Sequence, residues 1–394
     1  MTSLGQFFIR VLKLGATAYG GPAMFGQIKR TAVHQYAWVE EEDFLRGLAL
    51  CQLIPGATMI QVITYVGYRV RGFWGALVAA MAFVLPAFIA LLLLSVIYFK
   101  MQTLGFVQAL FKGVGAIVIA ILLDACMVFG KSILKDWKLG LITVLSFIGF
   151  FFRLNILLIF ACAALTALVL RVKADPAKTA PASGTSRPNE TKRKDRLFLL
   201  VIGLLLCSGL ALSYLFDPLT LPLFLTFAKI GAIAFGGGYP MLSLIQYEAV
   251  DRFHWLSTKE LLDGIALGQI TPGPVLITAT FVGYKVLGFL GAVLATVGVF
   301  APCFFILVLL LPYHNRMGEM EKVRRMEKGI LGAFLGMLGG LLYHFGRASL
   351  VDAPTILLAG AAFVALYKNV KLPYVLIAGG ILSVLLFGLL PALF

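Results

Sequence analysis

Two Gly- and Pro-rich motifs occur twice in this chain, each time within a long apolar run. The first motif begins at Lys13 and again at Lys229, an offset of 216 residues (229 − 13). The second begins at Gly47 and again at Gly264, an offset of 217 residues (264 − 47). This spacing indicates a duplication. Duplicated halves with Gly and Pro breaks at corresponding positions are typical of membrane transporters whose substrate site lies between the repeats.

The composition of the chain is that of an integral membrane protein. Hydrophobic residues make up 60% of the 394 residues and charged residues 13%, whereas about a quarter of the residues of a soluble domain are charged. Four apolar stretches exceed the roughly 20 residues that cross a bilayer as a helix, namely 73–99, 104–129, 197–216 and 289–311. The two-residue alternation of a transmembrane β-barrel is absent from the sequence. We therefore predict an all-α, polytopic membrane protein.

The sequence predicts thirteen apolar segments, six in each half of the chain and one between the halves. They are 4–21, 46–69, 73–99, 104–130, 137–153, 155–172, 197–216, 222–238, 262–284, 288–312, 325–346, 354–368 and 372–394. Because the segment between the halves adds one crossing, the two repeats are expected to have inverted topology. Segments 4–21 and 222–238 are short and Gly-rich, so each either spans the membrane or re-enters it.

We divide the chain accordingly into four parts. They are a first transporter repeat (1–172), a basic linker (173–196), a connecting transmembrane helix (197–216) and a second transporter repeat (217–394). The formal net charge is +15, and residues 171–196 contain eight basic and three acidic side chains. Basic runs beside transmembrane helices mark the cytoplasmic side, so we place the linker in the cytoplasm and expect no nucleic-acid partner.

The Gly and Pro residues of the motifs predict helices that are broken inside the membrane, because Gly permits non-helical backbone and Pro removes a donor. Such a break persists only where its freed backbone groups face protein or a water-filled cavity. The helix that starts after a break offers unpaired N–H groups and a partial positive charge, which suit a small oxyanion. The alternative is that these glycines only allow close helix packing. The substrate-binding candidates are Gly20, Gly21, Pro55, Gly56, Gly236, Gly237, Gly238, Pro272 and Gly273.

Matched polar side chains are further candidates for the substrate site. Lys13 and Lys229 each lie two residues before a glycine in an apolar run, and two ammonium groups would balance a divalent anion. Snorkelling to the lipid headgroups is the alternative for these lysines. Gln52 and Gln269 can donate to oxyanion oxygens through their amides, and Thr271 offers a hydroxyl. A structural role in hydrogen bonding between helices is equally open for these three residues.

Asp124 and His344 are isolated polar residues within apolar runs. Because buried Asp and His in membranes form proton relays, both are candidates for coupling transport to protons. The five Cys residues show no metal-ligand spacing, and we expect neither a metal nor a cofactor. The sequence contains no P-loop, His-Glu-x-x-His or Gly-x-Ser-x-Gly motif, so we do not expect an enzyme.

The paired Phe/Tyr-Gly-Gly and Gln-x-x-Pro-Gly blocks resemble those of the chromate ion transporter (CHR) family in its long, two-domain form. The blocks occupy 18–22, 47–56, 234–239 and 264–274, and the resemblance covers nearly the whole chain outside the linker. The resemblance implies a multi-pass transporter of the inner (plasma) membrane that expels chromate. It also implies that the proton gradient drives transport and that the homologous halves have opposite orientations.

Three functions stay open at this point. The first is proton-coupled export of chromate from the cytoplasm, which would give chromate resistance. The second is transport of sulfate or another oxyanion, because backbone N–H groups and ammonium groups recognise charge and shape rather than the central atom. The third is an anion channel that uses the broken helices as a filter. The expected partners are the anion, protons and the lipid bilayer, and a homodimer is also open.

Overall fold

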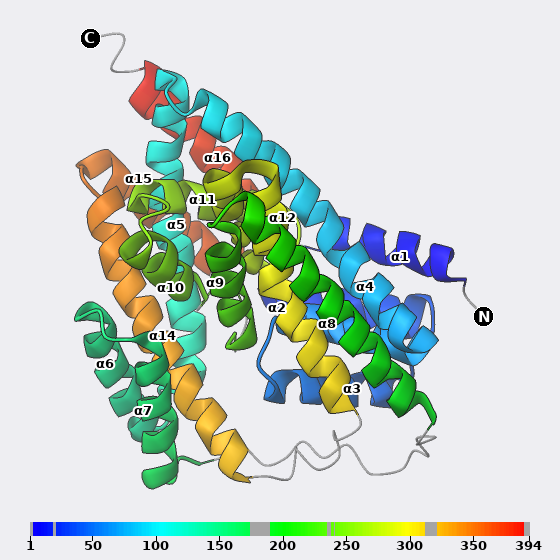
Figure 1. Ribbon diagram of the computed structural model, residues 1–394. Helices are drawn as coiled ribbons and strands as arrows, with labels where there is room; N and C mark the ends of the chain where they lie inside the picture. Colours follow the sequence, from blue (N-terminus) through cyan, green and yellow to red (C-terminus); the bar gives the residue numbers. More distant parts are fainter. Residues whose placement is uncertain are drawn as a thin grey trace. The chain divides into compact units, whose positions relative to one another are not determined.

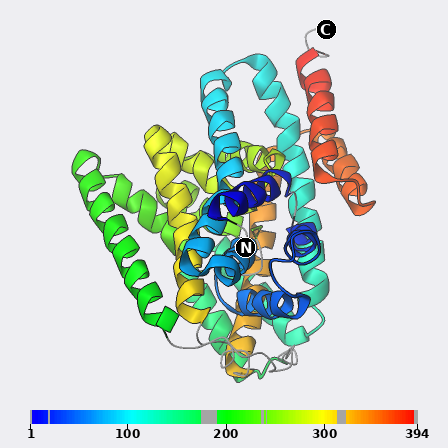
Figure 2. The same ribbon diagram turned by 90° about the vertical axis from the view of Figure 1, so that its right-hand side faces the viewer.

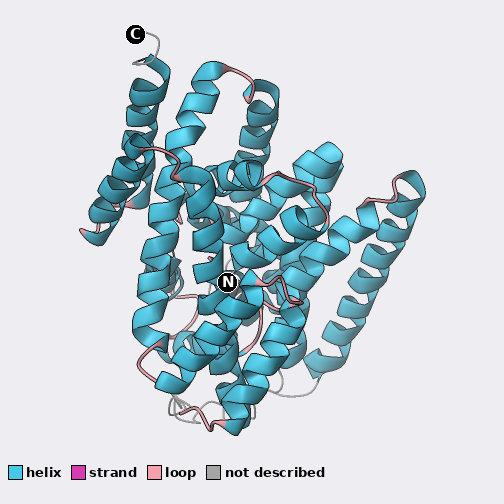
Figure 3. Cartoon of the chain, turned by 90° about the vertical axis from the view of Figure 1, so that its left-hand side faces the viewer, coloured by secondary structure: helices cyan, strands magenta, loops and turns pink. Residues whose placement is uncertain are grey.

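The computed structural model describes residues 3–18, 21–173, 190–234, 238–239, 241–311 and 321–389. Within these ranges the regular structure is entirely helical (Figures 1 and 3). The helices are α1 (Leu4–Thr17), α2 (Gly21–Lys29), η1 (Arg30–Gln35), α3 (Glu41–Leu53), α4 (Thr58–Met101), α5 (Gly105–Ile133), α6 (Trp137–Phe151), α7 (Ile156–Val169), α8 (Glu190–Phe216), α9 (Thr220–Ala232), α10 (Met241–Ile245), η2 (Gln246–Arg252), α11 (Thr258–Ile270), η3 (Val275–Ile277), α12 (Thr278–Leu310), α14 (Glu321–Ser349), α15 (Ala353–Tyr367), α16 (Leu372–Val384) and η5 (Leu385–Leu389).

Among the described residues, six stretches of helix are long and apolar enough to cross a membrane. They are 58–101, 105–133, 197–216, 275–310, 321–349 and 372–389. Shorter apolar helices of 10–17 residues are α6, α7, α9 and α15. This confirms the prediction of an all-α, polytopic membrane protein.

Two of the expected crossing helices are not continuous. Segment 46–69 is interrupted between Leu53 and Thr58, and segment 262–284 is interrupted between Ile270 and Thr278, apart from the short turn η3. The Pro and Gly residues of the second motif lie in both interruptions. The prediction that these segments contain broken helices is therefore confirmed.

Two further segments end sooner than expected. In segment 4–21 the helix α1 has 14 residues, and in segment 222–238 the helix α9 has 13 residues. At 1.5 Å per residue these helices are about 20 Å long, which is shorter than the roughly 30 Å hydrocarbon core of a bilayer. Neither helix is long enough to cross the membrane by itself.

Both α4 and α12 reverse sharply at one point. The reversal in α4 is at Arg71 (φ −145°, ψ 26°) and Gly72 (φ 60°, ψ −147°). The reversal in α12 is at Leu287 and Gly288, which have nearly the same dihedral angles. Glycine allows the positive φ that these turns require. The two turns are 216 residues apart, so the duplication seen in the sequence is also present in the backbone.

The two limbs of each reversal touch through glycines. A Cβ on Gly67 would collide with the backbone oxygen of Gly75, and a Cβ on Gly283 would collide with the backbone oxygen of Gly291. Residues eight apart in a continuous helix are about 12 Å apart along its axis. The close contacts therefore require the chain to fold back, and small residues permit this approach of the backbones.

The chain forms two compact units, and each unit takes segments from both repeats. The first unit consists of the described residues within 1–89, 174–238 and 272–324, and the second of those within 90–173, 239–271 and 325–394. The compact units are therefore not the sequence repeats. The division at residues 172, 196 and 216 describes the duplication and stays a prediction.

In the first unit, the short helices α1 and α9 pack closely on the long helices. A Cβ on Gly15 of α1 would collide with the backbone of Phe83, and a Cβ on Gly231 of α9 would collide with the backbone of Val299. These two contacts are related by the 216-residue offset. Figure 1 shows α9 beside α12. In each repeat, the short helix thus packs against the second limb of the long helix of the same repeat.

The connecting helix α8 packs on the first unit through aromatic and aliphatic side chains. Leu199 belongs to a buried cluster with Phe73 and Phe304, and Phe198 stacks on Phe73 with ring centroids 5.3 Å apart. Much of the rest of α8 is exposed. An apolar helix with one packed face and one exposed face suits a position at the lipid boundary.

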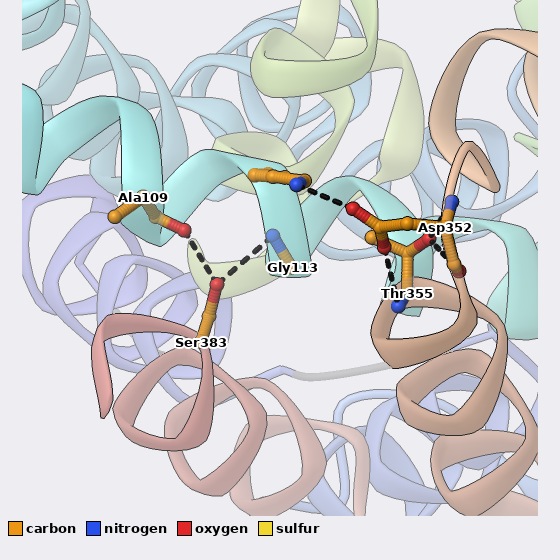
Figure 4. A network of polar contacts seen from close by, with 6 residues as sticks. Ala109, Gly113, Asp352, Thr355 and Ser383 are labelled. Atoms are coloured by element: carbon orange, nitrogen blue, oxygen red, sulfur yellow. Dashed lines mark hydrogen bonds and ion pairs between the residues drawn. The ribbon is translucent and has the colours of Figure 1, made fainter. Parts of the chain in front are cut away.

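In the second unit, α15 and α16 pack along α5 (Figure 2). The Ser383 hydroxyl lies between two turns of α5: it accepts from the Gly113 N–H at 2.9 Å and donates to the Ala109 carbonyl at 2.5 Å (Figure 4). Gly113 has no side chain to block this approach. A buried hydroxyl that satisfies a backbone donor and a backbone acceptor fixes the register of the two helices.

A second polar link joins α5 to the start of α15. The Lys112 ammonium donates to Asp352 at 2.5 Å, and Asp352 accepts from the Thr355 N–H at 3.0 Å as the N-cap of α15 (Figure 4). The hydrogen bond from Lys112, followed by that from the Thr355 N–H, holds the pKa of Asp352 below its ordinary value. A capping residue with a charged partner stabilises the helix start.

We expect Asp352→Ala to lower the free energy of unfolding by about 1 kcal/mol at neutral pH, the usual loss from an N-cap. Asp352→Asn should cost less, because an amide oxygen still caps the helix. The lowered pKa means that the charge-dependent stabilisation is present above about pH 4, the ordinary value of Asp, and is lost as the pH falls through the folded pKa. Thermal unfolding in detergent from pH 7 to pH 3 measures this. A difference between wild type and Asp352→Asn that does not shrink in acid would contradict the prediction.

Candidate substrate site

The broken segments of the two repeats cross each other in the first unit. The Gly56 N–H donates to the Ala234 carbonyl at 2.5 Å, and the Gly273 N–H donates to the Ala18 carbonyl at 2.8 Å. Ala18 and Ala234 are equivalent positions just after α1 and α9, and Gly56 and Gly273 are equivalent positions in the second motif. The second motif of each repeat therefore donates a hydrogen bond to the first motif of the opposite repeat. The structure thus brings together the two motifs that each occur twice in the sequence.

Both glycines at this crossing have backbone conformations that favour glycine. Gly56 has φ 137° and Gly273 has φ 112°. A Cβ on Gly56 would collide with the Gln61 amide and lie 3.1 Å from the Cys303 sulfur. A Cβ on Gly273 would lie 2.8 Å from the Ala87 Cβ. Residues with side chains rarely adopt such angles, so the crossing depends on glycine at both positions.

Two residues at the crossing were not identified from the sequence. Cys303 accepts from the Ala57 N–H with its sulfur at 3.0 Å. Gln61 is 1% exposed and donates from Nε2 to the Pro55 carbonyl at 2.8 Å. Its Oε1 is buried without a hydrogen-bond partner among the described residues. With the 217-residue offset of the second motif, the position equivalent to Gln61 in the second repeat is Thr278 (61 + 217). The comparison of the two repeats therefore did not single out Gln61.

Three backbone N–H groups within the interruptions already donate hydrogen bonds to other parts of the protein. Those of Gly56 and Gly273 bind carbonyls of the other repeat, and that of Ala57 binds Cys303. The N–H groups of the first turn of α4, from Thr58 onward, have no acceptor within their own helix, as in every α-helix. The electropositive helix end expected from the sequence thus lies at the start of α4, next to the crossing.

The remaining first-unit candidates have different surroundings. Lys13 is exposed near the end of α1, and Lys229 is half-buried in the last turn of α9. A Cβ on Gly238 would lie 2.5 Å from the Val275 Cβ. Gln52 is exposed near the end of α3. Pro55 and Pro272 lie in the interruptions, and Gly21 opens α2.

Three of the glycine candidates, Gly20, Gly236 and Gly237, lie outside the described residues. The roles of all these first-unit residues stay predictions.

In the second unit, the Gln269 amide has a donor that no described residue accepts from. Gln269 is 7% exposed, and its Oε1 accepts from the Tyr239 hydroxyl at 3.2 Å. Its Nε2 is buried without a partner among the described residues. The Thr271 hydroxyl, by contrast, donates to the Gly268 carbonyl at 2.9 Å. A buried amide with an unused donor is costly unless a ligand or water satisfies it, so Gln269 is the better placed of the two to bind an oxyanion.

The two candidates for proton coupling are both half-buried in the second unit. Asp124 of α5 interacts electrostatically with Tyr239, the residue that binds Gln269. His344 of α14 stacks on Phe151 with centroids 6.3 Å apart and interacts electrostatically with Asp251. Asp124 therefore lies near Tyr239, which hydrogen-bonds a predicted substrate residue. The roles of Asp124 and His344 stay predictions.

A model of the family described as chromate transporter matches residues 5–168 and 221–384. The chain belongs to the chromate transporter family. The two matched stretches start 216 residues apart (221 − 5), which is the offset between the motifs. The resemblance inferred from the paired motifs is confirmed, as is the presence of two repeats.

Relatives of this chromate transporter family member align over nearly its whole length. A chromate transport protein of Cupriavidus metallidurans is 32% identical over 96% of this chain and 91% of its own length. A probable chromate transport protein of Synechococcus elongatus is 33% identical over 96% and 93%, and an uncharacterised transporter of Methanocaldococcus jannaschii is 34% identical over 97% and 94%. No solved structure matches the chain.

Proposed function

We propose that this protein is a secondary active transporter that moves chromate out of the cytoplasm across the inner (plasma) membrane, coupled to the proton gradient, and so confers chromate resistance. The observation that carries the proposal is the reciprocal crossing of Gly56 and Gly273 with Ala234 and Ala18, in a chain of the chromate transporter family. Relatives named as chromate transport proteins support the choice of substrate.

The crossing has the features expected of an oxyanion site. Two backbone hydrogen bonds hold the interrupted segments in place, so the first N–H groups of α4 are oriented before the anion binds. Preorganised N–H donors at a helix start bind a small anion without a fixed positive side chain. Lys229, which is half-buried in the last turn of α9, would add a cationic charge. Such a site recognises a tetrahedral dianion by its shape and charge.

Inverted repeats would provide the transport step. In the topology that we propose, each repeat contributes one broken segment to the site, and the two repeats have opposite orientations. Motion of one repeat relative to the other then exposes the site to each side of the membrane in turn. Asp124 and His344 are our candidates for residues on the proton route.

Flux measurements in proteoliposomes test this function. We expect radiolabelled chromate to accumulate against its gradient when a pH gradient is imposed, and to stop accumulating when a protonophore removes that gradient. Unlabelled sulfate should compete if the site reads only shape and charge. Passive chromate flux that is independent of the pH gradient would contradict coupled transport and favour an anion channel.

The two matched glutamines should differ in their contributions to transport. Gln269 is buried with an amide donor that has no partner in the described part of the chain, and Gln52 is exposed. A hydrogen bond to a charged group contributes about 1.5–3 kcal/mol, or roughly a ten- to hundred-fold change in binding. We therefore expect Gln269→Ala to raise the KM for chromate by about that factor, and Gln52→Ala to change it by less than about twofold. Equal effects of the two substitutions would show that the buried amide is not a substrate ligand.

A further inference from the structure

The second unit contains a cavity lined by both polar and apolar side chains. Its volume is about 460 Å³. Side chains of α5, α11, the end of α14 and η5 line it, including Lys112, Lys259, Asp263, Ser349 and Phe387. A cavity of this size holds several water molecules. Neither Asp124 nor His344 lines it.

Asp263 is the buried acid of this cavity. The residue is 3% exposed, and its Oδ2 accepts from the Tyr98 hydroxyl at 2.7 Å. Tyr98 is itself 6% exposed and packs edge-on against Phe111, with centroids 5.0 Å apart. The hydrogen-bond partner of this carboxylate is therefore a neutral phenol in an apolar environment. A buried carboxylate with such a partner is costly to keep charged, and binding of a proton removes that cost.

The charged groups around Asp263 act in both directions. Lys259 lies one turn before Asp263 on α11 and favours the charged carboxylate, whereas Glu260 on the same helix disfavours it. From α5 the cavity receives Lys112, whose charge is offset by Asp352 at 2.5 Å. The residues lining the cavity from α14 and η5, such as Ser349 and Phe387, carry no charge. Burial and the nearby cation thus oppose each other, which allows Asp263 to exchange a proton rather than stay in one state.

We infer that Asp263, supported by Tyr98, is the residue that takes up and releases the transported proton, which reaches it through this cavity. In the uptake step a proton adds to a carboxylate oxygen of Asp263 and neutralises it. In the release step the proton returns to water and the Tyr98 hydroxyl again donates to a carboxylate. Lys259 at the cavity favours release. This inference rests on the proposed proton-coupled transport.

The test compares two modes of chromate flux for Asp263→Asn in proteoliposomes. One mode is accumulation driven by a pH gradient, and the other is counterflow, the exchange of labelled for unlabelled chromate at equal pH. We expect Asp263→Asn to lose gradient-driven accumulation by at least tenfold and to keep counterflow within about twofold, because exchange requires no net proton movement. Wild-type accumulation by Asp263→Asn would overturn the inference, and so would loss of both modes in a variant that unfolds at the wild-type temperature.

Two further variants sharpen the test. Glu260→Gln removes a carboxylate three residues away on the same helix while keeping a side chain suited to the capping box with Ser257. It should retain both flux modes, and the pH of half-maximal transport should move downward because Glu260 disfavours the charged form of Asp263. Tyr98→Phe removes the hydrogen bond that stabilises the charged form of Asp263, so the pH of half-maximal transport should move upward. An unchanged pH profile in Tyr98→Phe would overturn the inference even if Asp263→Asn failed to fold. Absence of any chromate flux in the wild type would instead refute the proposed function.

Discussion

Gly56→Leu and Gly273→Leu are each expected to abolish chromate transport. Both glycines have positive φ angles, 137° and 112°, and a side chain in such a conformation costs of order 1–3 kcal/mol. The added atoms would also displace Gln61 and Cys303 at Gly56, or Ala87 at Gly273. Relieving these clashes breaks the hydrogen bonds to Ala234 and Ala18 that hold the broken segments. A displacement of about 1 Å at such a site costs roughly a hundredfold in rate.

The measurement is the initial rate of chromate uptake into proteoliposomes at matched protein content. Gly26→Leu is the control, because Gly26 is exposed on α2 and a Cβ there meets nothing within 4 Å. It should transport at the wild-type rate. Wild-type flux in either Gly56→Leu or Gly273→Leu would remove the crossing from the transport mechanism.

Gly67→Leu and Gly283→Leu should prevent the protein from assembling. At these positions the limbs of α4 and α12 contact backbone to backbone, so a Cβ would collide with the carbonyl groups of Gly75 and Gly291. Backbone atoms cannot move aside as a flexible side chain can. Overpacking of an ordinary core costs about 1–3 kcal/mol, and separating two helical limbs should cost more. We expect the amount of monodisperse protein in detergent to fall at least about tenfold.

Gly209→Leu provides the matched control for assembly. Gly209 is an exposed residue of the apolar helix α8, with nothing within 4 Å of an added Cβ. This variant should be produced and unfold like the wild type, since leucine suits a lipid-facing position. Normal yield and an unchanged unfolding temperature for Gly283→Leu would show that the contact between the limbs is not required.

At the second motif of each repeat, the sequence predicts the break in the helix but not the residue that binds it. Pro55 and Gly56 could be identified from the sequence as a break, because Pro and Gly disfavour helix wherever they occur. The acceptor of the Gly56 N–H could not, because Ala234 is an ordinary apolar residue far along the chain. The same holds for Asp263 and Tyr98, which are 165 residues apart. The sequence drew attention to Asp124 and His344 instead, because they stand out within apolar runs.

The sequence by itself determined that this protein is a helical membrane protein with two copies of one repeat, since apolar length, Gly and Pro breaks and periodic spacing are properties of the local chain. Tertiary structure alone decided that α4 and α12 fold back at Gly72 and Gly288, that Gly56 binds Ala234 and Gly273 binds Ala18, and that a buried carboxylate meets a phenol beside a cavity. The physical reason is that burial and hydrogen-bond partners depend on which distant segments become neighbours, and local composition does not specify those neighbours.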